Sequence, residues 1–166
     1  IPGGVCISSQ GFVKSLQYIE FGHLAHMHTA ICLEVENIDD ERIDLPRFIW
    51  AYIVLSYVDV TLKFASNFFH ALRYSWPITV KAELETNEPM RISRLSSNTP
   101  FNPRKSDHLS DFSHDLNLSL LDVETTPSQL AEDRTLLLSS AYNLFWAFGL
   151  GWSESVVAKW LAEITS

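Results

Sequence analysis

The stretch that decides the fold is residues 47–73, RFIWAYIVLSYVDVTLKFASNFFHALR. Its apolar residues recur at intervals of three and four, which is the spacing of one face of an α-helix. The members of this stripe are Phe48, Ala51, Tyr52, Leu55, Val58, Leu62, Ala65, Phe69 and Leu72. Asp44 can cap the helix and Pro46 can lie in its first turn, where a missing N–H costs nothing. The pattern predicts one long helix over about 47–73, ended by Tyr74-Ser75-Trp76-Pro77.

Several segments on both sides of this helix alternate apolar and polar residues, as strands with one buried face do. The expected strands are short pieces within 4–20, then 29–36, 78–85, 91–95 and 116–120. Two C-terminal helices follow, one opened by Pro127 and running to Phe148, and a short one capped by Ser153. The first carries an apolar stripe of Leu130, Leu137, Ala141, Leu144 and Phe148. We predict an α+β fold with a mainly antiparallel sheet packed on one long helix (about 47–73) and two C-terminal helices.

The composition predicts an acidic globular domain. The chain has 166 residues, 46% of them hydrophobic, with 12 Lys+Arg against 20 Asp+Glu and a formal net charge of -8. We expect a single domain over 1–166, and the apolar content excludes an intrinsically disordered chain. The acidic balance argues against a nucleic-acid-binding surface spread over the whole molecule.

The sequence shows neither a recognisable secretory signal nor an apolar run long enough to cross a bilayer. Its longest apolar run, 48–58, is far shorter than the ~20 residues that cross a bilayer, so we expect no membrane association. Two cysteines, Cys6 and Cys32, are too few for a disulfide framework. With no recognisable secretory signal, we expect a cytoplasmic protein. Because the chain starts at Ile1, we expect a fragment of a longer protein.

The densest histidine cluster is His23, His26 and His28. Imidazoles are common ligands of transition metals, so these three are candidate metal ligands, although their spacing matches no strong metal motif. The long polar loop expected at 96–115 adds His108 and His114 beside carboxylates, an arrangement that can serve acid–base chemistry. A metal-dependent hydrolase is therefore an alternative function, whereas ordinary surface or half-buried histidines are the interpretation that we favour.

Four basic residues gather near this loop, namely Arg91, Arg94, Arg104 and Lys105. They are candidates for binding phosphate or a nucleic-acid backbone, which gives a nucleic-acid-associated module as a further alternative. Ordinary surface charge flanking a loop is the interpretation that we favour, and the six glycines form no phosphate-binding motif. We expect no cofactor, and no nucleic-acid binding by this fragment alone.

Aromatic residues are abundant, with five tryptophans and ten phenylalanines. If the domain binds a small ligand, the expected place is between the long helix and the sheet, where apolar walls suit a pocket. The candidate ligand-binding residues are Tyr52, Trp76, Phe145 and Trp146. Phe145 and Trp146 lie partly off the stripe of the 127–148 helix. They therefore also indicate a surface for an upstream domain or a second copy of the chain.

Three segments together resemble a known family. GFVKSLQYIEFG (11–22), FFHALRYSWPITVKAELE (68–85) followed by PMRI (89–92), and LLLSSAYNLFWAFGLG (136–151) are similar to the C-terminal region of bacterial Schlafen AlbA-2-type proteins, which are ATP-binding or nucleic-acid-associated. The resemblance covers about half of the chain and is one of pattern. The AlbA-2 motifs themselves are absent, so no functional residue carries over. The resemblance implies an accessory domain of a larger protein.

The function that we expect is therefore a non-catalytic accessory, sensor or interaction domain of a larger cytoplasmic protein. No catalytic motif accompanies the aromatic helices, and this favours packing against a partner over chemistry. The expected partner is an upstream domain of the same protein or a second copy, and a small-molecule ligand is an additional option.

Overall fold

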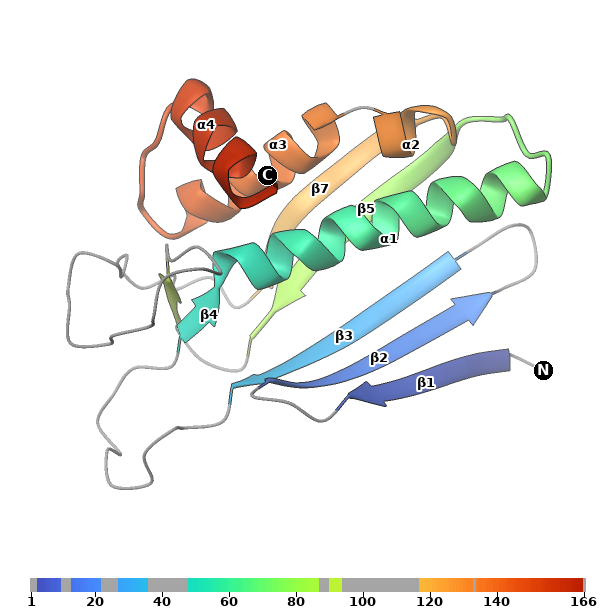
Figure 1. The fold of residues 1–166 in the computed structure, drawn as a ribbon, viewed down its shortest axis with the longest axis horizontal. Coiled ribbons are helices and arrows are strands. Elements are labelled where there is room, and N and C mark those ends of the chain that lie inside the picture. The colour runs from blue at the N-terminus through green and yellow to red at the C-terminus, as the bar shows by residue number, and fades with distance from the viewer. Residues whose placement is uncertain are drawn as a thin grey trace. The chain divides into compact units, whose positions relative to one another are not determined.

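The computed structural model describes residues 3–9, 13–21, 27–35, 48–86, 90–93, 117–132 and 134–165. Contacts group the chain into two compact units, Ile1–Leu45 and Pro46–Ser166, and Figure 1 shows the elements of each. The single domain expected over 1–166 stays a prediction. The loop expected at 96–115 lies outside the described residues.

The first unit contains a three-stranded antiparallel sheet of β1 (Gly3–Ser9), β2 (Val13–Phe21) and β3 (Met27–Val35), with β2 in the middle. The strands expected within 4–20 and at 29–36 are therefore confirmed. Cys6 lies on β1 and Cys32 on β3. Because neighbouring strands are about 4.8 Å apart, β1 and β3 are about 10 Å apart, which exceeds the Cα separation that a disulfide allows. The sheet thus keeps the two cysteines from pairing within the unit.

The second unit begins with a strand that the sequence did not predict. β4 (Phe48–Trp50) leads directly into α1 (Ala51–Ala71) and pairs in parallel with β6 (Arg91–Ser93). The helix expected from 47 therefore begins four residues later. Ile49 lies opposite Ile92, and these two side chains are 3% and 0% exposed. Burying this pair across a strand ladder outweighs continuing the helix, and Phe, Ile and Trp are good strand formers.

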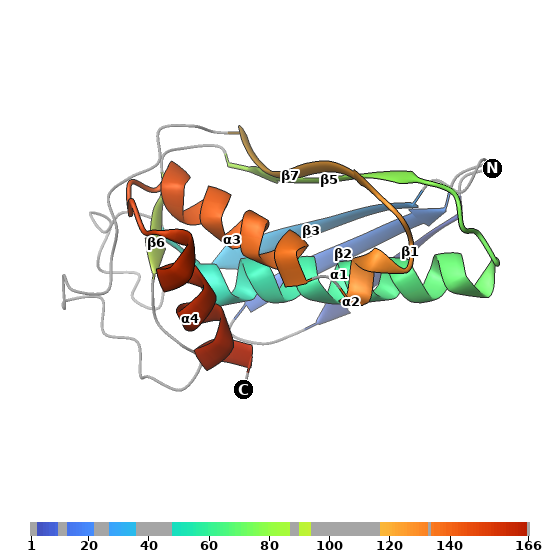
Figure 2. The same ribbon diagram turned by 90° about the horizontal axis from the view of Figure 1, so that it is seen from above.

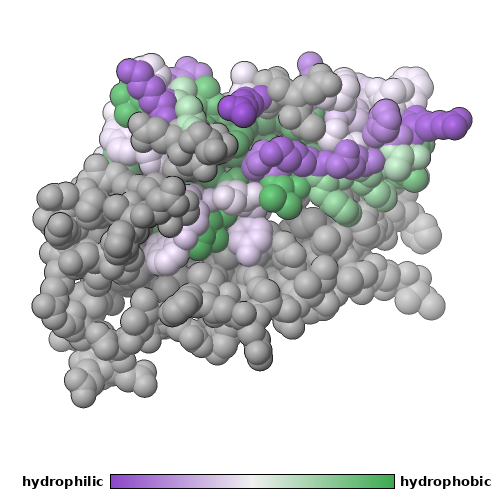
Figure 3. Space-filling view, viewed as in Figure 1, coloured by the Kyte–Doolittle hydropathy of each residue, from purple (hydrophilic) through white to green (hydrophobic). Residues whose placement is uncertain are grey.

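α1 buries most of the predicted apolar stripe, whose members Tyr52 and Val58 are half-buried. Its buried residues are Ala51, Val54, Leu55, Leu62, Ala65 and Phe69, and Val54 is the one member absent from the predicted stripe. Leu72, the last member of that stripe, is exposed because the helix has already ended. Figure 3 shows hydrophilic and hydrophobic residues side by side over α1, so the face of the helix seen in that view is mixed. Lys63 and Asp59 form an ion pair of 2.7 Å there.

The C-terminus of α1 is a Schellman motif, a hydrogen-bonding pattern that closes many helices. The Arg73 N–H donates to the His70 carbonyl at 2.9 Å, and the Tyr74 N–H donates to the Phe69 carbonyl at 2.9 Å. The rings of Phe69 and Tyr74 are 5.5 Å apart and supply the apolar contact typical of the motif. Arg73 takes the left-handed position with φ 54°. The helix therefore ends at Ala71, just before the Tyr74-Ser75-Trp76-Pro77 segment that the sequence predicts to stop it, and Tyr74 of that segment closes the motif.

Arg73→Gly is expected to stabilise the unit by ~1 kcal/mol, because a side chain at positive φ is strained and glycine is not. Gly149 occupies the same position of an identical motif at the end of another helix, with φ 70°. Gly149→Ala should therefore destabilise the unit by a similar amount. Urea unfolding of both variants measures these changes. A loss of stability in Arg73→Gly would contradict the assignment.

Two longer strands form the second sheet of this unit. β5 (Ile78–Glu85) and β7 (Asn117–Thr125) are antiparallel. Their register shifts at Ala82/Glu83, where β7 carries an extra residue, so Leu120 and Leu121 are both buried. The Asn143 side chain donates a 3.0 Å hydrogen bond to the Leu120 carbonyl. This bond satisfies a carbonyl at the irregular point of the ladder, and it anchors the helix that carries Asn143 to the bulge.

Three helices complete the unit: α2 (Gln129–Glu132), α3 (Arg134–Ala147) and α4 (Glu154–Thr165). The single helix expected from Pro127 to Phe148 is thus two helices. The Gln129 side chain accepts a 3.2 Å bond from the Thr126 N–H, which resembles a capping box with Pro127 in the first turn. Every member of the predicted stripe, Leu130, Leu137, Ala141, Leu144 and Phe148, is buried. α4 begins directly after Ser153, whose carbonyl accepts the first helical hydrogen bonds.

The fold is α+β, as the sequence predicts. Figure 2 shows β5 and β7 nearly edge-on, with α3 and α1 on one side of them. The described strands form three separate sheets, because β4 and β6 make a short parallel pair of their own. Antiparallel pairing dominates in the other two sheets.

Candidate interaction surface

α3 is apolar on two different sides. One side carries Leu137, Ala141, Leu144 and Phe145, which are buried against β7, α1 and α4. A helix that is apolar all round is usually enclosed on every side. α3 is enclosed on one side only within the part of the chain that the structure describes, so its second apolar side needs an explanation.

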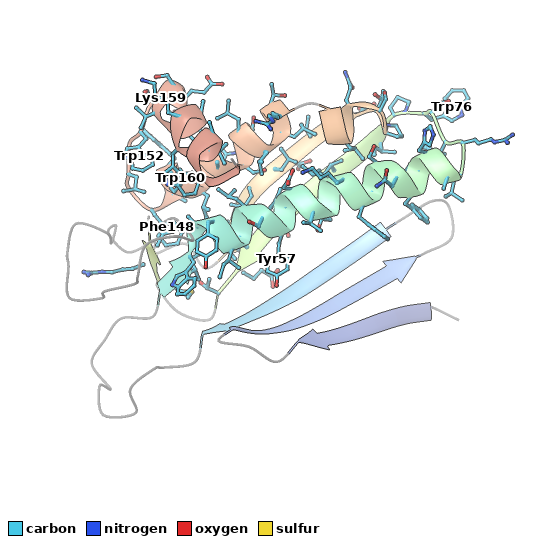
Figure 4. All side chains as sticks on the ribbon, viewed as in Figure 1. Tyr57, Trp76, Phe148, Trp152, Lys159 and Trp160 are labelled. Carbon is cyan, nitrogen blue, oxygen red and sulfur yellow. The ribbon has the colours of Figure 1, made fainter. Side chains whose placement is uncertain are left out.

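Phe145 is the centre of the enclosed side. Its side chain is 1% exposed. Its ring centroid lies 4.9 Å from that of Trp152 and 4.9 Å from that of Trp160, the latter in an edge-to-face arrangement at 87°. These contacts connect α3, the turn after it and α4. Figure 4 shows Phe148, Trp152 and Trp160 gathered at the same end of the unit.

The second apolar side of α3 is the ridge Leu138–Tyr142–Trp146, three residues spaced four apart. Trp146 is 63% exposed, and its ring stacks on that of Tyr142 at 6.3 Å with an interplanar angle of 14°. The charged residue of α3, Arg134, lies at its first position. The ridge therefore presents an uncharged, partly rigid aromatic surface to solvent. Trp and Tyr are the residues that most often dominate binding energy in protein interfaces.

Another exposed tryptophan lies far from the ridge. Trp76, between α1 and β5, is 72% exposed, and the neighbouring Leu72 is also exposed. Figure 4 places Trp76 at the opposite end of α1 from Phe148. Because α1 has 21 residues, its ends are ~30 Å apart. Trp76 therefore does not belong to the ridge, and it serves as a matched control for Trp146.

The structure does not bring together the four residues expected to bind a ligand. Tyr52 lies in the first turn of α1, and Trp76 follows its last turn. Phe145 is enclosed in the core, whereas Trp146, one residue later, points to the exposed side of the same helix. Consecutive helical residues differ in direction by about 100°, so Phe145 and Trp146 cannot line one wall. The length of α1 separates the other two.

Tyr52 instead belongs to a corner beside β4. Its ring lies 5.5 Å from that of Trp50. Burial raises the pKa of the Tyr52 hydroxyl above its usual value, because the charged form would lose hydration. Arg91 lies opposite Phe48 in the β4–β6 pair, and Phe48 is two residues before Trp50 in the sequence. The Nε atom of Arg91 is buried. Arg91 is thus partly enclosed within the fold rather than fully displayed on the surface.

The other basic and histidine predictions fall largely outside the described residues. Arg94, Arg104, Lys105, His23, His26, His108 and His114 are not described, and His28 is placed on β3 by its backbone alone. Phosphate binding by the basic patch and metal binding by His23, His26 and His28 stay predictions. In the described part of the chain, no group of three His, Cys, Asp or Glu side chains could hold a metal.

Comparison with known proteins gives no family. No family model matches the chain, and neither a curated protein nor a solved structure matches it. Among the described residues, every helix is too short or too polar to cross a bilayer. The interpretation of function therefore depends on the surface of the second unit itself.

Proposed function

We propose that this chain is a non-catalytic interaction domain and that the ridge Leu138–Tyr142–Trp146 is its contact surface for a protein partner. The observation that carries the proposal is Trp146, 63% exposed and stacked on Tyr142. Covering an aromatic side chain of this size is worth about 1.5–3 kcal/mol. Trp146 stacked on Tyr142 forms a contiguous apolar surface rather than a single exposed side chain, and contiguous exposed apolar surfaces mark interaction sites.

The spacing of the ridge indicates the kind of partner. Residues four apart on one helix face form a continuous row, and such rows insert into apolar grooves or pack on a second helix. The exposed neighbours Thr135, Ser139 and Asn143 are polar but uncharged, so they add no charge to the surface. An apolar groove or helix face of another protein domain fits this surface best. The resemblance of residues 136–151 to the C-terminal region of Schlafen AlbA-2-type proteins implies an accessory domain, which agrees with this proposal.

The test is affinity purification of the tagged full-length protein from the cells that make it, with bound proteins quantified by mass spectrometry. Trp146→Ser is expected to reduce recovery of the specific partner at least about tenfold, since hot-spot truncation costs roughly 2 kcal/mol or more. Trp76→Ser, which removes an even more exposed tryptophan, should leave recovery unchanged. Equal recovery with Trp146→Ser and with the unaltered protein would refute the proposal.

A further inference from the structure

β5 has an edge that no described strand occupies. It is hydrogen-bonded to β7 on one side, and these two strands form a two-stranded sheet among the strands that the structure describes. Its eight residues contain neither proline nor glycine, and the extra residue of the bulge lies in β7 rather than in β5. Exposed edges are usually interrupted by proline, bulges or inward-pointing charges. β5 is a regular strand with its alternation intact.

The alternation gives β5 two distinct faces. Thr79, Lys81, Glu83 and Glu85 are exposed, whereas Ile78, Val80, Ala82 and Leu84 are half-buried on the side of the helices. On the exposed face, Lys81 forms a 3.2 Å ion pair with Asp122 of β7. Glu83, Glu85 and Glu124 also lie on this face and make it acidic. Any strand that pairs with β5 must match both the charged face and the apolar face.

We propose that β5 pairs antiparallel with β5 of a second copy of this chain, about a two-fold axis at Ala82. In this register Lys81 of each copy lies opposite Glu83 of the other, so two opposite-charge pairs form on the exposed face. On the inner face, Val80 lies opposite Leu84 and Ala82 opposite Ala82. Two two-stranded sheets become one four-stranded sheet, and sheets of at least three strands are the independently stable ones.

Neighbouring registers are less favourable. An axis at Lys81 places Lys81 opposite itself, and an axis at Glu83 places Glu83 opposite itself. Like charges directly opposite each other destabilise a sheet. An axis between two residues, for example between Lys81 and Ala82, places Lys81 opposite Ala82 and Val80 opposite Glu83. This register mixes charged and apolar positions on each face. The charge pattern of β5 therefore favours the register at Ala82, and a closed two-fold pair is the commonest form of self-association.

Charge reversal in two single variants tests this arrangement. Lys81→Glu places a second glutamate opposite each Glu83, and Glu83→Lys places a second lysine opposite each Lys81. We expect the dimer dissociation constant of each single variant to be at least about tenfold larger than that of the unaltered chain. A tenfold change corresponds to 1.4 kcal/mol, summed over the two reversed pairs. In a heterodimer of the two variants, one copy has glutamate at both 81 and 83 and the other has lysine at both. Both cross-copy pairs then join a glutamate to a lysine, so mixing the variants should restore dimerisation.

The double variant Lys81→Glu/Glu83→Lys is the rescue. It exchanges the two charges within each copy, so both cross-copy pairs again join opposite charges and near-normal dimerisation should return. Sedimentation velocity over a range of concentrations measures the two single variants, the double variant and the unaltered chain.

Lys63→Glu is the matched control, because Lys63 is also an exposed lysine in an ion pair but lies on α1. It should leave dimerisation unchanged. Trp146→Ser should leave it unchanged as well, so failure of this inference and failure of the proposed contact surface are distinguishable. A folded chain that stays monomeric at all concentrations would overturn the proposal, as would single variants that dimerise normally. A monomer with slowly exchanging β5 amides would overturn it too, by showing that another segment of the same chain covers the edge.

Discussion

Phe145→Ala is expected to lower the free energy of unfolding by about 3–5 kcal/mol, the usual cost of removing a fully buried phenyl ring. The centroid of the Phe145 ring lies 4.9 Å from the ring centroids of both Trp152 and Trp160. Removing the ring therefore opens a cavity between α3, the following turn and α4. Aromatic pairs add to the cost beyond the area that they bury. Urea unfolding followed by circular dichroism measures the change.

The neighbouring residue provides the control. Trp146→Ala removes a larger ring from the same turn of the same helix, yet this ring is 63% exposed. We expect the loss to stay below about 1 kcal/mol, because substitutions at exposed positions rarely cost more. A larger loss from Trp146→Ala than from Phe145→Ala would mean that the two sides of α3 are assigned the wrong way round.

Leu55→Ala is expected to cost about 2–5 kcal/mol. Leu55 is 1% exposed and lies in the buried stripe of α1, the helix that spans the unit and contacts α2 and α3. A cavity at this point weakens the contact of the helix with its neighbours, and close-packed cores do not collapse fully around such a gap.

Val60→Ala on the same helix is the corresponding control, since Val60 is 57% exposed. Its expected effect is within about 0.5 kcal/mol. The same urea titration compares the two variants. Equal losses in both would show that α1 does not bury the stripe that its sequence spacing indicates.

The buried faces of α1 and α3 could be predicted because each depends only on residues close together in the sequence. Helical periodicity depends on residues three and four apart, so the buried stripes up to Phe69 and Phe148 could be predicted without knowing what covers them, whereas the predicted continuation to Leu72 was wrong. β4 could not be predicted this way, because its partner β6 lies some forty residues away in sequence. A three-residue apolar strand before a helix has the same composition as a first helical turn, and only the Ile49–Ile92 pairing distinguishes them.

The candidate site was predictable in part. The position of Trp146 off the buried stripe was visible in the sequence, and its spacing from Leu138 and Tyr142 was available as well. Residue type alone could not separate enclosed Phe145 from exposed Trp146, nor show that Tyr52 and Trp76 lie at opposite ends of α1. A site built from side chains of several elements depends on their three-dimensional arrangement, which the pattern of one segment does not contain.

The most direct test of the interaction surface combines stability and binding in one variant, Trp146→Ser. The contact role predicts an unfolding free energy within about 1 kcal/mol of the unaltered protein and a loss of at least about tenfold in partner recovery. Trp76→Ser, measured beside it, should change neither quantity. If Trp146→Ser loses stability as Phe145→Ala does, or keeps its partner in full, the ridge on α3 is not a contact surface.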